Sequence, residues 1–207
     1  AFVMENVGGM VRGRMRGRFR ELMLELKRTG YNVKCFAANA MHYGVPQSRT
    51  RLFWIGLKDG NPTFPEPSTN MIRMMDVLSD LGNKMNEKKD HYWIDESPEG
   101  RNTRTWPLAR AAKQGETYAG HQKRMRWNRP ALCLMAGDTI NKPYLRNHHC
   151  HPLYTRTLSA LEMKRVATFP DNFKLPEWRA HKLIGNCVPP EFMRRIGEHI
   201  KGLIDGF

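Results

Sequence analysis

The stretch at residues 43–56 (Tyr-Gly-Val-Pro-Gln-Ser-Arg-Thr-Arg-Leu-Phe-Trp-Ile-Gly) constrains the fold more than any other part of the chain. Its Gly-x-Pro turn leads into an apolar run, which predicts a buried strand that begins just after a tight turn. Arg49 and Arg51 stand two positions apart before this run, so on an extended backbone both side chains leave on the same side. Two cations there favour an anionic or carbonyl-rich ligand, and a hairpin with solvated arginines is the alternative.

The first residues add a second constraint. Phe2, Val3 and Met4 form a short apolar run that predicts a strand, and Glu5 stands at its carboxyl end, shortly before two glycines. Open α/β sheets place ligand-binding groups at this position, although a glutamate there can also cap the next helix or form an ion pair with it. The run lacks the usual lead-in of a first strand, so we expect the chain to begin in the middle of a larger fold.

The charge of the chain favours a polyanionic partner. Its 207 residues include 34 Lys and Arg against 20 Asp and Glu, a formal net charge of +14. Nucleic acid is the partner that such a balance indicates, with a generic basic protein as the alternative. The composition is that of a soluble globular protein of one or two domains, without an apolar run of the roughly 18 residues that a membrane span needs. Four scattered cysteines without a Cys-x-x-Cys pair indicate reduced thiols in a cytosolic protein.

Hydrophobic periodicity predicts the order of the elements. They are a helix over 15–29, strands over 31–36 and 52–57, a short helix over 71–78, a strand over 130–135, a helix from 159 to about 168, and a terminal helix after Pro189. Strand, helix, strand and strand make half of an α/β sheet. Prolines at 61–70 indicate a boundary, and the basic residues and aromatics between 82 and 129 suit either nucleic-acid contact or the small core of a loop-rich domain.

Two further motifs are less specific. Five arginines alternate through Arg12, Arg14, Arg16, Arg18 and Arg20. Alternate positions spread around a helix, so we expect a solvated or phosphate-facing collar and no precise site. The run at 148–151 (His-His-Cys-His) contains metal-ligand residue types, but neighbouring side chains diverge, so we expect no zinc site.

Four blocks, taken together, resemble the cytosine-5 DNA methyltransferases in identity, order and spacing. They are Phe-Val-Met-Glu-Asn-Val at 2–7, Tyr-Gly-Val-Pro-Gln-Ser-Arg-Thr-Arg at 43–51, Thr-Arg-Thr-Leu-Ser at 155–159 continuing to Phe-Pro-Asp-Asn-Phe at 169–173, and Ile-Gly-Asn-Cys-Val-Pro-Pro at 184–190. The resemblance implies the second half of a Rossmann-like α/β methyltransferase sheet domain plus a small, loop-rich target-recognition domain. The corresponding divisions are 1–65 for the sheet half, 66–175 for target recognition, and 176–207 for a segment returning to the sheet.

The resemblance also implies residue roles. Glu5 matches the family glutamate that holds the flipped cytosine at N3 and its exocyclic amine. Arg51 matches the arginine on the cytosine O2 side, and Arg49 the arginine that supports the base and the nearby phosphate. For S-adenosylmethionine the matching positions are Asn186, Cys187 and Val188. The residues that we expect to contact DNA are Gln47, Arg49, Arg129, Cys133 and Arg146. Cysteine replaces a commoner small residue at 187, and Cys133 with Leu134 stands where the family carries Thr-Leu.

One departure from the family pattern concerns the nucleophile. No cysteine here follows a proline, so the Pro-Cys nucleophile motif is absent, as is the Phe-x-Gly-x-Gly cofactor loop. We therefore expect part of a cytosine-5 DNA methyltransferase, of the kind found in restriction–modification systems, that is inactive alone. A second polypeptide, or the rest of a longer chain, would supply both motifs. The alternatives are a catalytically inactive DNA-binding protein derived from this fold and, with less support, a transfer-RNA cytosine methyltransferase.

Overall fold

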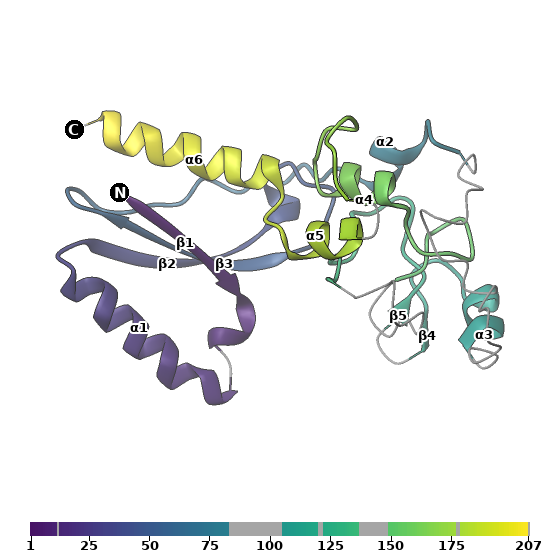
Figure 1. The fold of residues 1–207 in the computed structure, drawn as a ribbon, viewed down its shortest axis with the longest axis horizontal. Coiled ribbons are helices and arrows are strands. Elements are labelled where there is room, and N and C mark those ends of the chain that lie inside the picture. Colours follow the sequence, from purple (N-terminus) through teal and green to yellow (C-terminus); the bar gives the residue numbers. More distant parts are fainter. Residues whose placement is uncertain (12, 83–104, 120–121, 137–148, 177–178, 207) are drawn as a thin grey trace.

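The computed structural model describes residues 1–11, 13–82, 105–119, 122–136, 149–176 and 179–206. A three-stranded sheet with a long helix on each side forms one end of the molecule, and short helices and strands form the other (Figure 1). Within the described residues, no helix combines the length and apolar character that crossing a membrane requires.

The sheet has the strand order β1-β3-β2, in which β3 (Thr50–Leu57) lies between β1 (Phe2–Val7) and β2 (Asn32–Asn39). The central strand β3 is antiparallel to both neighbours, so β1 and β2 run in the same direction. Val7 therefore lies opposite Arg51, and Asn39 lies opposite Thr50. The last residues of β1 and β2 thus meet the first residues of β3 at one end of the sheet.

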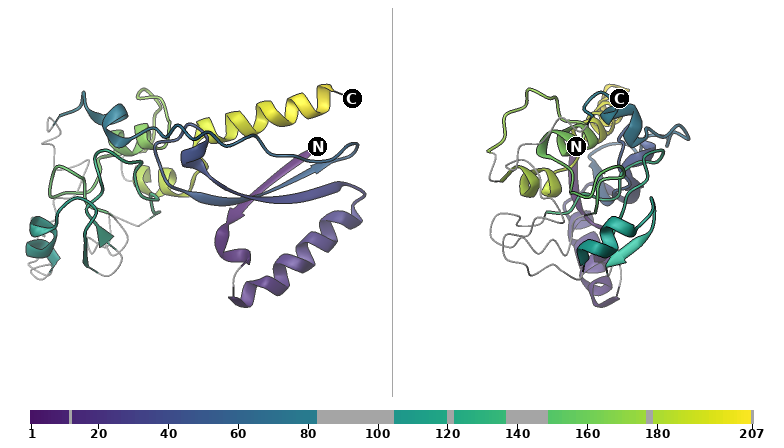
Figure 2. Two further views of the ribbon diagram at one scale, coloured as in Figure 1. Left: turned by 180° about the vertical axis from the view of Figure 1, so that it is seen from behind. Right: turned by 90° about the vertical axis from the view of Figure 1, so that its right-hand side faces the viewer.

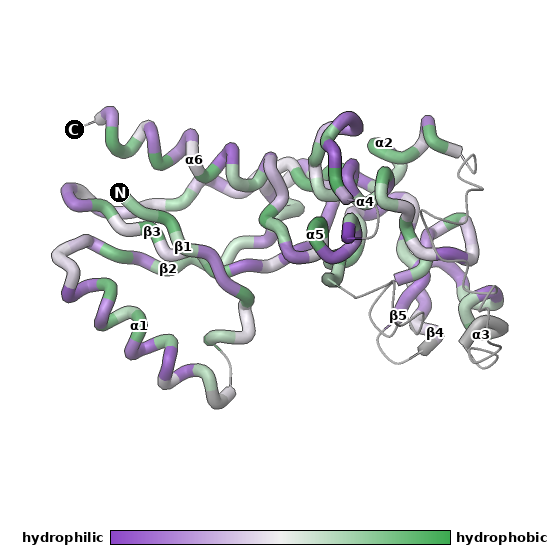
Figure 3. The backbone as a smooth tube through the Cα atoms, in the orientation of Figure 1, coloured by the Kyte–Doolittle hydropathy of each residue, from purple (hydrophilic) through white to green (hydrophobic). Residues whose placement is uncertain are grey.

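Two amphipathic helices cover the two faces of this sheet. On one face, α1 (Arg16–Arg28) places Phe19, Leu22, Met23 and Leu26 against Leu52 and Trp54. On the other, α6 (Pro190–Asp205) places Phe192, Ile196 and Ile200 against Val45, Phe53 and Ile55. Apolar residues recur along both helices between polar ones (Figure 3). Phe192 and Ile196 of α6 are fully buried, and each stabilises the fold by about 1.5–3 kcal/mol. The structure confirms both helices predicted from periodicity.

The short elements form a second region of the molecule. They are α2 (Met74–Leu78), α3 (Thr105–Ala111), β4 (Thr117–Ala119), β5 (Gln122–Lys123), α4 (Ala160–Val166) and α5 (Ala180–Asn186), besides 3₁₀ turns at Gly8–Val11, Gly13–Met15 and Ala40–His42. Residues of α2, α4 and α5 are buried together in a second core, which includes Met74, Met163, Val166 and Ile184. A separate small cluster contains Ala109 of α3, Tyr118 of β4 and Cys150. Figure 2 shows the same division of the molecule from behind and from one end.

The strand predicted over 130–135 is wrong. The segment forms only an isolated bridge, in which Ala131 N–H donates to Pro46 O and Ser48 N–H donates to Ala131 O. Pro130 has no N–H to donate, and the next hydrogen bond from this segment goes to the Gln47 side chain instead of a neighbouring backbone. The segment therefore connects the two cores: its apolar residues Ala131 and Leu134 pack in the second core, and its backbone bonds to residues 46–48.

Candidate active site

Glu5 and Arg51 form a partly exposed ion pair at the end of the sheet. Arg51 Nε lies 3.0 Å from Glu5 Oε1, with 14% of the arginine side chain and 28% of the glutamate side chain exposed. The pair is diagonal across β1 and β3, because Glu5 lies opposite Phe53 and Arg51 opposite Val7. Arg51 Nη1 also donates to Thr50 O at 2.8 Å. An acid and a cation thus stand side by side where a ligand can reach both.

Arg49, two residues before Arg51, is 2% exposed. Its Nη1 donates to Leu134 O at 3.0 Å and to the Cys133 sulfur at 3.5 Å, and its Nη2 donates to Gly185 O at 2.9 Å. Burial lowers the pKa of Arg49, and the neighbouring Arg51 lowers it further. The carbonyl-rich ligand expected beside this arginine is the backbone of the protein itself.

Gln47, two residues before Arg49, binds the same segment around Leu134. Its side chain is buried, and Oε1 accepts a hydrogen bond from Leu134 N–H at 3.1 Å. Together with Arg49, it fixes residues 131–134 against the turn that precedes β3. A hydrogen-bonded amide and a hydrogen-bonded guanidinium, both buried, make a rigid connection between the sheet and the second core.

Gly185 lets α5 approach this connection closely. A Cβ atom at this position would lie 2.5 Å from the Met135 carbonyl carbon and from Ala136 N. Any side chain would therefore push the end of α5 away from residues 135–136, and the Gly185 carbonyl would move with it. The glycine of the Gly-Asn-x-Val-Pro-Pro block is therefore needed here for packing. This packing also keeps its carbonyl in place as one of the acceptors of Arg49.

The three residues predicted to bind the cofactor come directly after Gly185 in the sequence. Asn186 is exposed, and Cys187 is partly buried, with its thiol donating to Ile184 O at 3.0 Å. Burial raises the pKa of the Cys187 thiol, against the opposing effect of Arg49. Val188 packs against the core between the sheet and α6.

The remaining predicted DNA contacts lie elsewhere. Arg129 is exposed in the second region, and its carbonyl accepts from Met74 N–H at 3.0 Å. Arg146 lies outside the described residues. Cys133 is partly buried beside Arg49. The structure thus brings the sheet residues and Cys133 together and leaves Arg129 in the second region.

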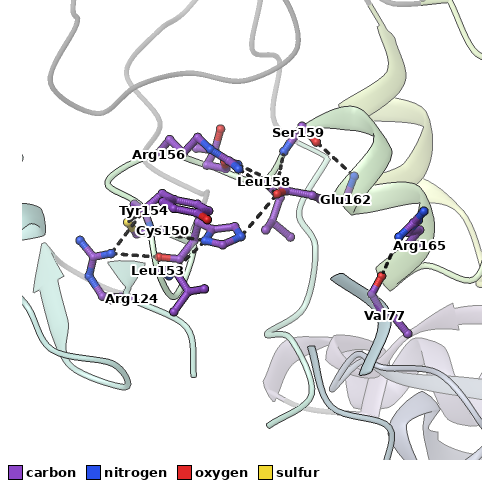
Figure 4. Close-up of polar contacts among 12 residues, drawn as sticks. Val77, Arg124, Cys150, Leu153, Tyr154, Arg156, Leu158, Ser159, Glu162 and Arg165 are labelled. Carbon is purple, nitrogen blue, oxygen red and sulfur yellow. Dashed lines mark hydrogen bonds and ion pairs between the residues drawn. The ribbon is translucent and has the colours of Figure 1, made fainter. Parts of the chain in front are cut away.

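A buried ionic cluster in the second region did not emerge from the sequence (Figure 4). Arg156 donates to both Glu162 oxygens at 2.7 and 2.8 Å, and His151 Nε2 lies 3.4 Å from Glu162 Oε1. All three side chains are at most 2% exposed. The predicted Ser159–Glu162 capping box is confirmed. The Glu162 carboxylate also forms the buried ion pair with Arg156. The only sequence signal for that pair is the arginine six residues earlier.

The protonation of this cluster follows from its hydrogen bonds. His151 Nδ1 accepts from the N–H groups of Leu153 and Tyr154 at 3.1 and 3.3 Å, so the ring proton sits on Nε2 and faces Glu162. Burial lowers the pKa of His151, and the nearby carboxylate offsets this only in part. Burial acts to raise the pKa of Glu162, but hydrogen bonds from Arg156 and His151 outweigh it and hold that pKa well below its ordinary value. The cluster therefore holds a neutral histidine beside an arginine–carboxylate pair.

Another buried arginine, Arg124, shows that the net charge overstates the number of cations available at the surface to bind DNA. Arg124 donates to the carbonyls of Ala109, Ala112, His151 and Tyr154 at 2.7 to 3.1 Å. Like Arg49, it holds chain segments together. Among the described residues, no group of three His, Cys, Asp or Glu side chains is placed to bind a metal ion.

Comparison with known proteins agrees with these features. The family model for C-5 cytosine-specific DNA methylases matches residues 1–202. The type II methyltransferase M1.HphI of Haemophilus parahaemolyticus is 29% identical over 96% of this chain and 56% of its own length. M.NgoPII of Neisseria gonorrhoeae is 27% identical over 99% of this chain and 65% of its own length. The chain thus spans between about half and two-thirds of these relatives.

Solved structures show the same fold. A DNA modification methyltransferase encoded within an E. coli prophage aligns with a TM-score of 0.70 at 20% identity, over 99% of this chain and 69% of that one. The S. pombe Dnmt2 methyltransferase aligns with a TM-score of 0.58 at 13% identity, over 98% of this chain and 66% of that one. The fold is therefore the mixed α/β fold of these methyltransferases, and the chain belongs to the C-5 cytosine-specific DNA methylase family.

Proposed function

We propose that this chain supplies the cytosine-holding and DNA-recognition side of a DNA (cytosine-5)-methyltransferase. The observation that carries the proposal is the accessible Glu5–Arg51 pair at the end of the sheet that joins the second region. Shape-only contact with DNA would need no acid beside a cation. A base with both donors and acceptors on one edge would need both.

The chemistry assigns a separate task to each member of the pair. Attack of a nucleophile on C6 of cytosine pushes negative charge into the ring. Arg51, facing O2, would stabilise that charge as it develops. Glu5, facing N3 and the exocyclic amine, would in its protonated form give its proton to N3, so that the ring does not carry the full negative charge. The cytosine must leave the duplex stack to reach them, because neither side chain can enter a stacked base pair.

Arg49 and Gln47 would act as positioning residues in this proposal. Both are buried and bonded to residues 133–134 or 185, so they set the distance between the cytosine-holding pair and the second region. Target recognition, including the contacts expected of Arg129, Cys133 and Arg146, would come from that region.

S-adenosylmethionine would supply the methyl group when bound. Asn186, Cys187 and Val188 fit one wall of its site, since an exposed amide stands beside an apolar side chain anchored to the sheet core. The rest of the site, with the Phe-x-Gly-x-Gly loop and the Pro-Cys nucleophile, would come from a complementing half. That half is either another part of the same polypeptide or a second chain.

The edge of the sheet supports the need for a complement. Among the described residues β1 pairs with β3 alone, so its other edge has unpaired backbone groups. Val3 and Val7 are exposed apolar side chains on this strand. A strand with open hydrogen-bonding groups and apolar side chains is a ready site for strand addition.

Reconstitution tests the proposal. The purified chain is mixed with a complementing half that carries both missing motifs, together with duplex DNA and labelled S-adenosylmethionine. We expect methyl transfer only when both halves are present, and loss of transfer in Arg51→Ala. Glu25→Gln, which removes an exposed carboxylate paired with Arg28 on α1, is the control and should transfer normally.

Three results would contradict the proposal. Transfer by the chain alone would remove the need for a complement. Full activity of Arg51→Ala would remove its role at the cytosine. Duplex binding without transfer, even with the complementing half, would favour the catalytically inactive DNA-binding protein.

A further inference from the structure

A patch of unpaired arginines lies on α1, outside the site described above. Arg16, Arg18 and Arg20 are exposed, and no carboxylate among the described residues forms an ion pair with them. The sequence places Arg12 and Arg14 just before them, and Glu21 is the first acid of the helix. Five arginines therefore precede the first compensating charge.

This arrangement opposes the stability of the helix that carries it. The positive end of a helix dipole favours acids and disfavours cations, and clustered like charges repel one another. The first turn of α1 has no acid, and Met15 at its N-cap provides no side-chain hydrogen bond. The ion pair of Arg28 with Glu25 lies at the opposite end of α1. The stability of the helix therefore does not explain these arginines, whereas binding of an anionic ligand does.

The patch lies at the catalytic end of the sheet. β1 leads from Glu5 through the turns Gly8–Val11 and Gly13–Met15 directly into α1. The turn Gly8–Val11 contacts both β3 and α1. In Figures 1 and 2 the first residues of α1 lie at the end of the sheet where β1 finishes, and its last residues lie at the far end. The arginines thus lie at the same end of the sheet as the Glu5–Arg51 pair but on the opposite face. Arg51 shares the face of Phe53 and Ile55, which pack against α6, whereas α1 packs on the other face.

Their geometry fits a phosphate backbone better than other polyanions. Positions 16, 18 and 20 spread around the helix, so they match no single base edge but can meet phosphates along a strand. An anionic membrane would need an apolar face beside the cations. That face of α1 is already occupied, since Phe19, Leu22 and Met23 pack on the sheet.

We propose that Arg16, Arg18 and Arg20 form a second DNA contact, which binds the phosphates of duplex DNA beside the flipped cytosine independently of sequence. The proposal rests on the proposed function, because it takes duplex DNA as the substrate. Recognition by the second region and this patch would then hold the duplex on two sides of the Glu5–Arg51 pair.

The test measures how salt weakens binding of the full chain to a random 30-base-pair duplex, by fluorescence anisotropy. Each phosphate contact adds roughly 0.9 to the slope of log affinity against log salt. Changing all three arginines to alanine should therefore flatten the slope by up to about 2.7. The triple lysine variant keeps the charges and should keep the slope. The control removes three exposed cations at the far end of the sheet, Lys27, Arg28 and Lys58, and should change the slope much less.

The outcomes separate this inference from the proposed function. An equal loss of slope in the patch and control variants would show general attraction and overturn the patch. An unchanged slope in the patch variant, with wild-type binding intact, would overturn it while leaving the proposed function standing. Absence of wild-type duplex binding at every salt concentration would overturn both.

The melting temperature of the triple alanine variant shows whether a loss of binding comes from a loss of folding. Removing cations from the positive end of α1 should leave the melting temperature of the triple alanine variant unchanged or higher. A lower melting temperature would assign the arginines a structural role and contradict the patch. Reduced binding to anionic vesicles, with duplex binding unchanged, would point to a membrane and also overturn it.

Discussion

At the scale of single residues, burial decides what each arginine does. Arg49, Arg124 and Arg156 are buried and hold backbone carbonyls or a carboxylate. Arg51 keeps its contact with Glu5 at an accessible surface. The spacing of Arg49 and Arg51 predicted two cations at one strand end, but spacing could not show that Arg49 binds backbone, because its acceptors lie at 134 and 185.

Removing the carboxylate of the buried cluster should be costly. Glu162→Ala leaves the Arg156 guanidinium buried without its counter-charge, so we expect the free energy of unfolding to fall by about 3–5 kcal/mol. Urea denaturation measures this. Glu198→Ala on α6, which removes an exposed partner of Arg194, should cost less than about 1 kcal/mol. Similar losses in the two variants would contradict the role of burial.

The same cluster should make the protein sensitive to acid. The pKa of His151 lies below its ordinary value of 6.5, so the unfolded state takes up a proton first and stability falls as pH drops below about 6.5. The pKa of Glu162 is held below its ordinary 4.5, so its contribution is present above that pH and is lost as pH falls further.

Urea denaturation at several pH values checks this dependence. Between pH 6.5 and 4.5, His151→Gln should show a flatter fall in stability than the wild type, because the glutamine does not titrate. His199→Gln, which changes a histidine bonded to Thr63 on the surface, should keep the wild-type slope. An unaltered slope in His151→Gln would rule out this histidine as the source.

At the scale of elements, local patterns predicted what local forces determine. The apolar stripes of α1 and α6 and the capping box of α4 depend on residues within one or two turns, and the structure has all three. The segment at 130–135 depends on partners at 46–48, some 85 residues away. Its apolar run therefore suggested a strand, although no neighbouring strand is there to complete a ladder.

The close approach of α5 to residues 135–136 can be tested by adding one methyl group. Gly185→Ala places a Cβ within 2.5 Å of backbone and should lower the free energy of unfolding by about 1–3 kcal/mol. Gly197→Ala on α6 has nothing within 4 Å and should raise it by up to about 1 kcal/mol through helix propensity. Thermal or urea unfolding distinguishes them, and a neutral Gly185→Ala would contradict the packing.

At the scale of the whole molecule, two cores meet at a junction that carries the candidate site. The sheet carries Glu5 and Arg51 at the end where β3 begins, and residues 131–134 connect that end to the second core. Four sequence blocks indicated the family, and the family match over residues 1–202 confirms it. The ionic cluster and the carbonyl contacts of Arg49 needed the structure, because they join residues that no local pattern connects.

The central claim is that Glu5 stabilises the reacting cytosine. Its most direct test is the single-turnover rate of methyl transfer by the assembled enzyme carrying Glu5→Gln, at saturating duplex DNA and S-adenosylmethionine. We predict a rate lower by about 100-fold or more, because glutamine cannot give N3 a proton. Duplex affinity should change little, because the side chain acts on the ring and not on the phosphates. A Glu5→Gln enzyme that transfers methyl groups at the wild-type rate would contradict the account.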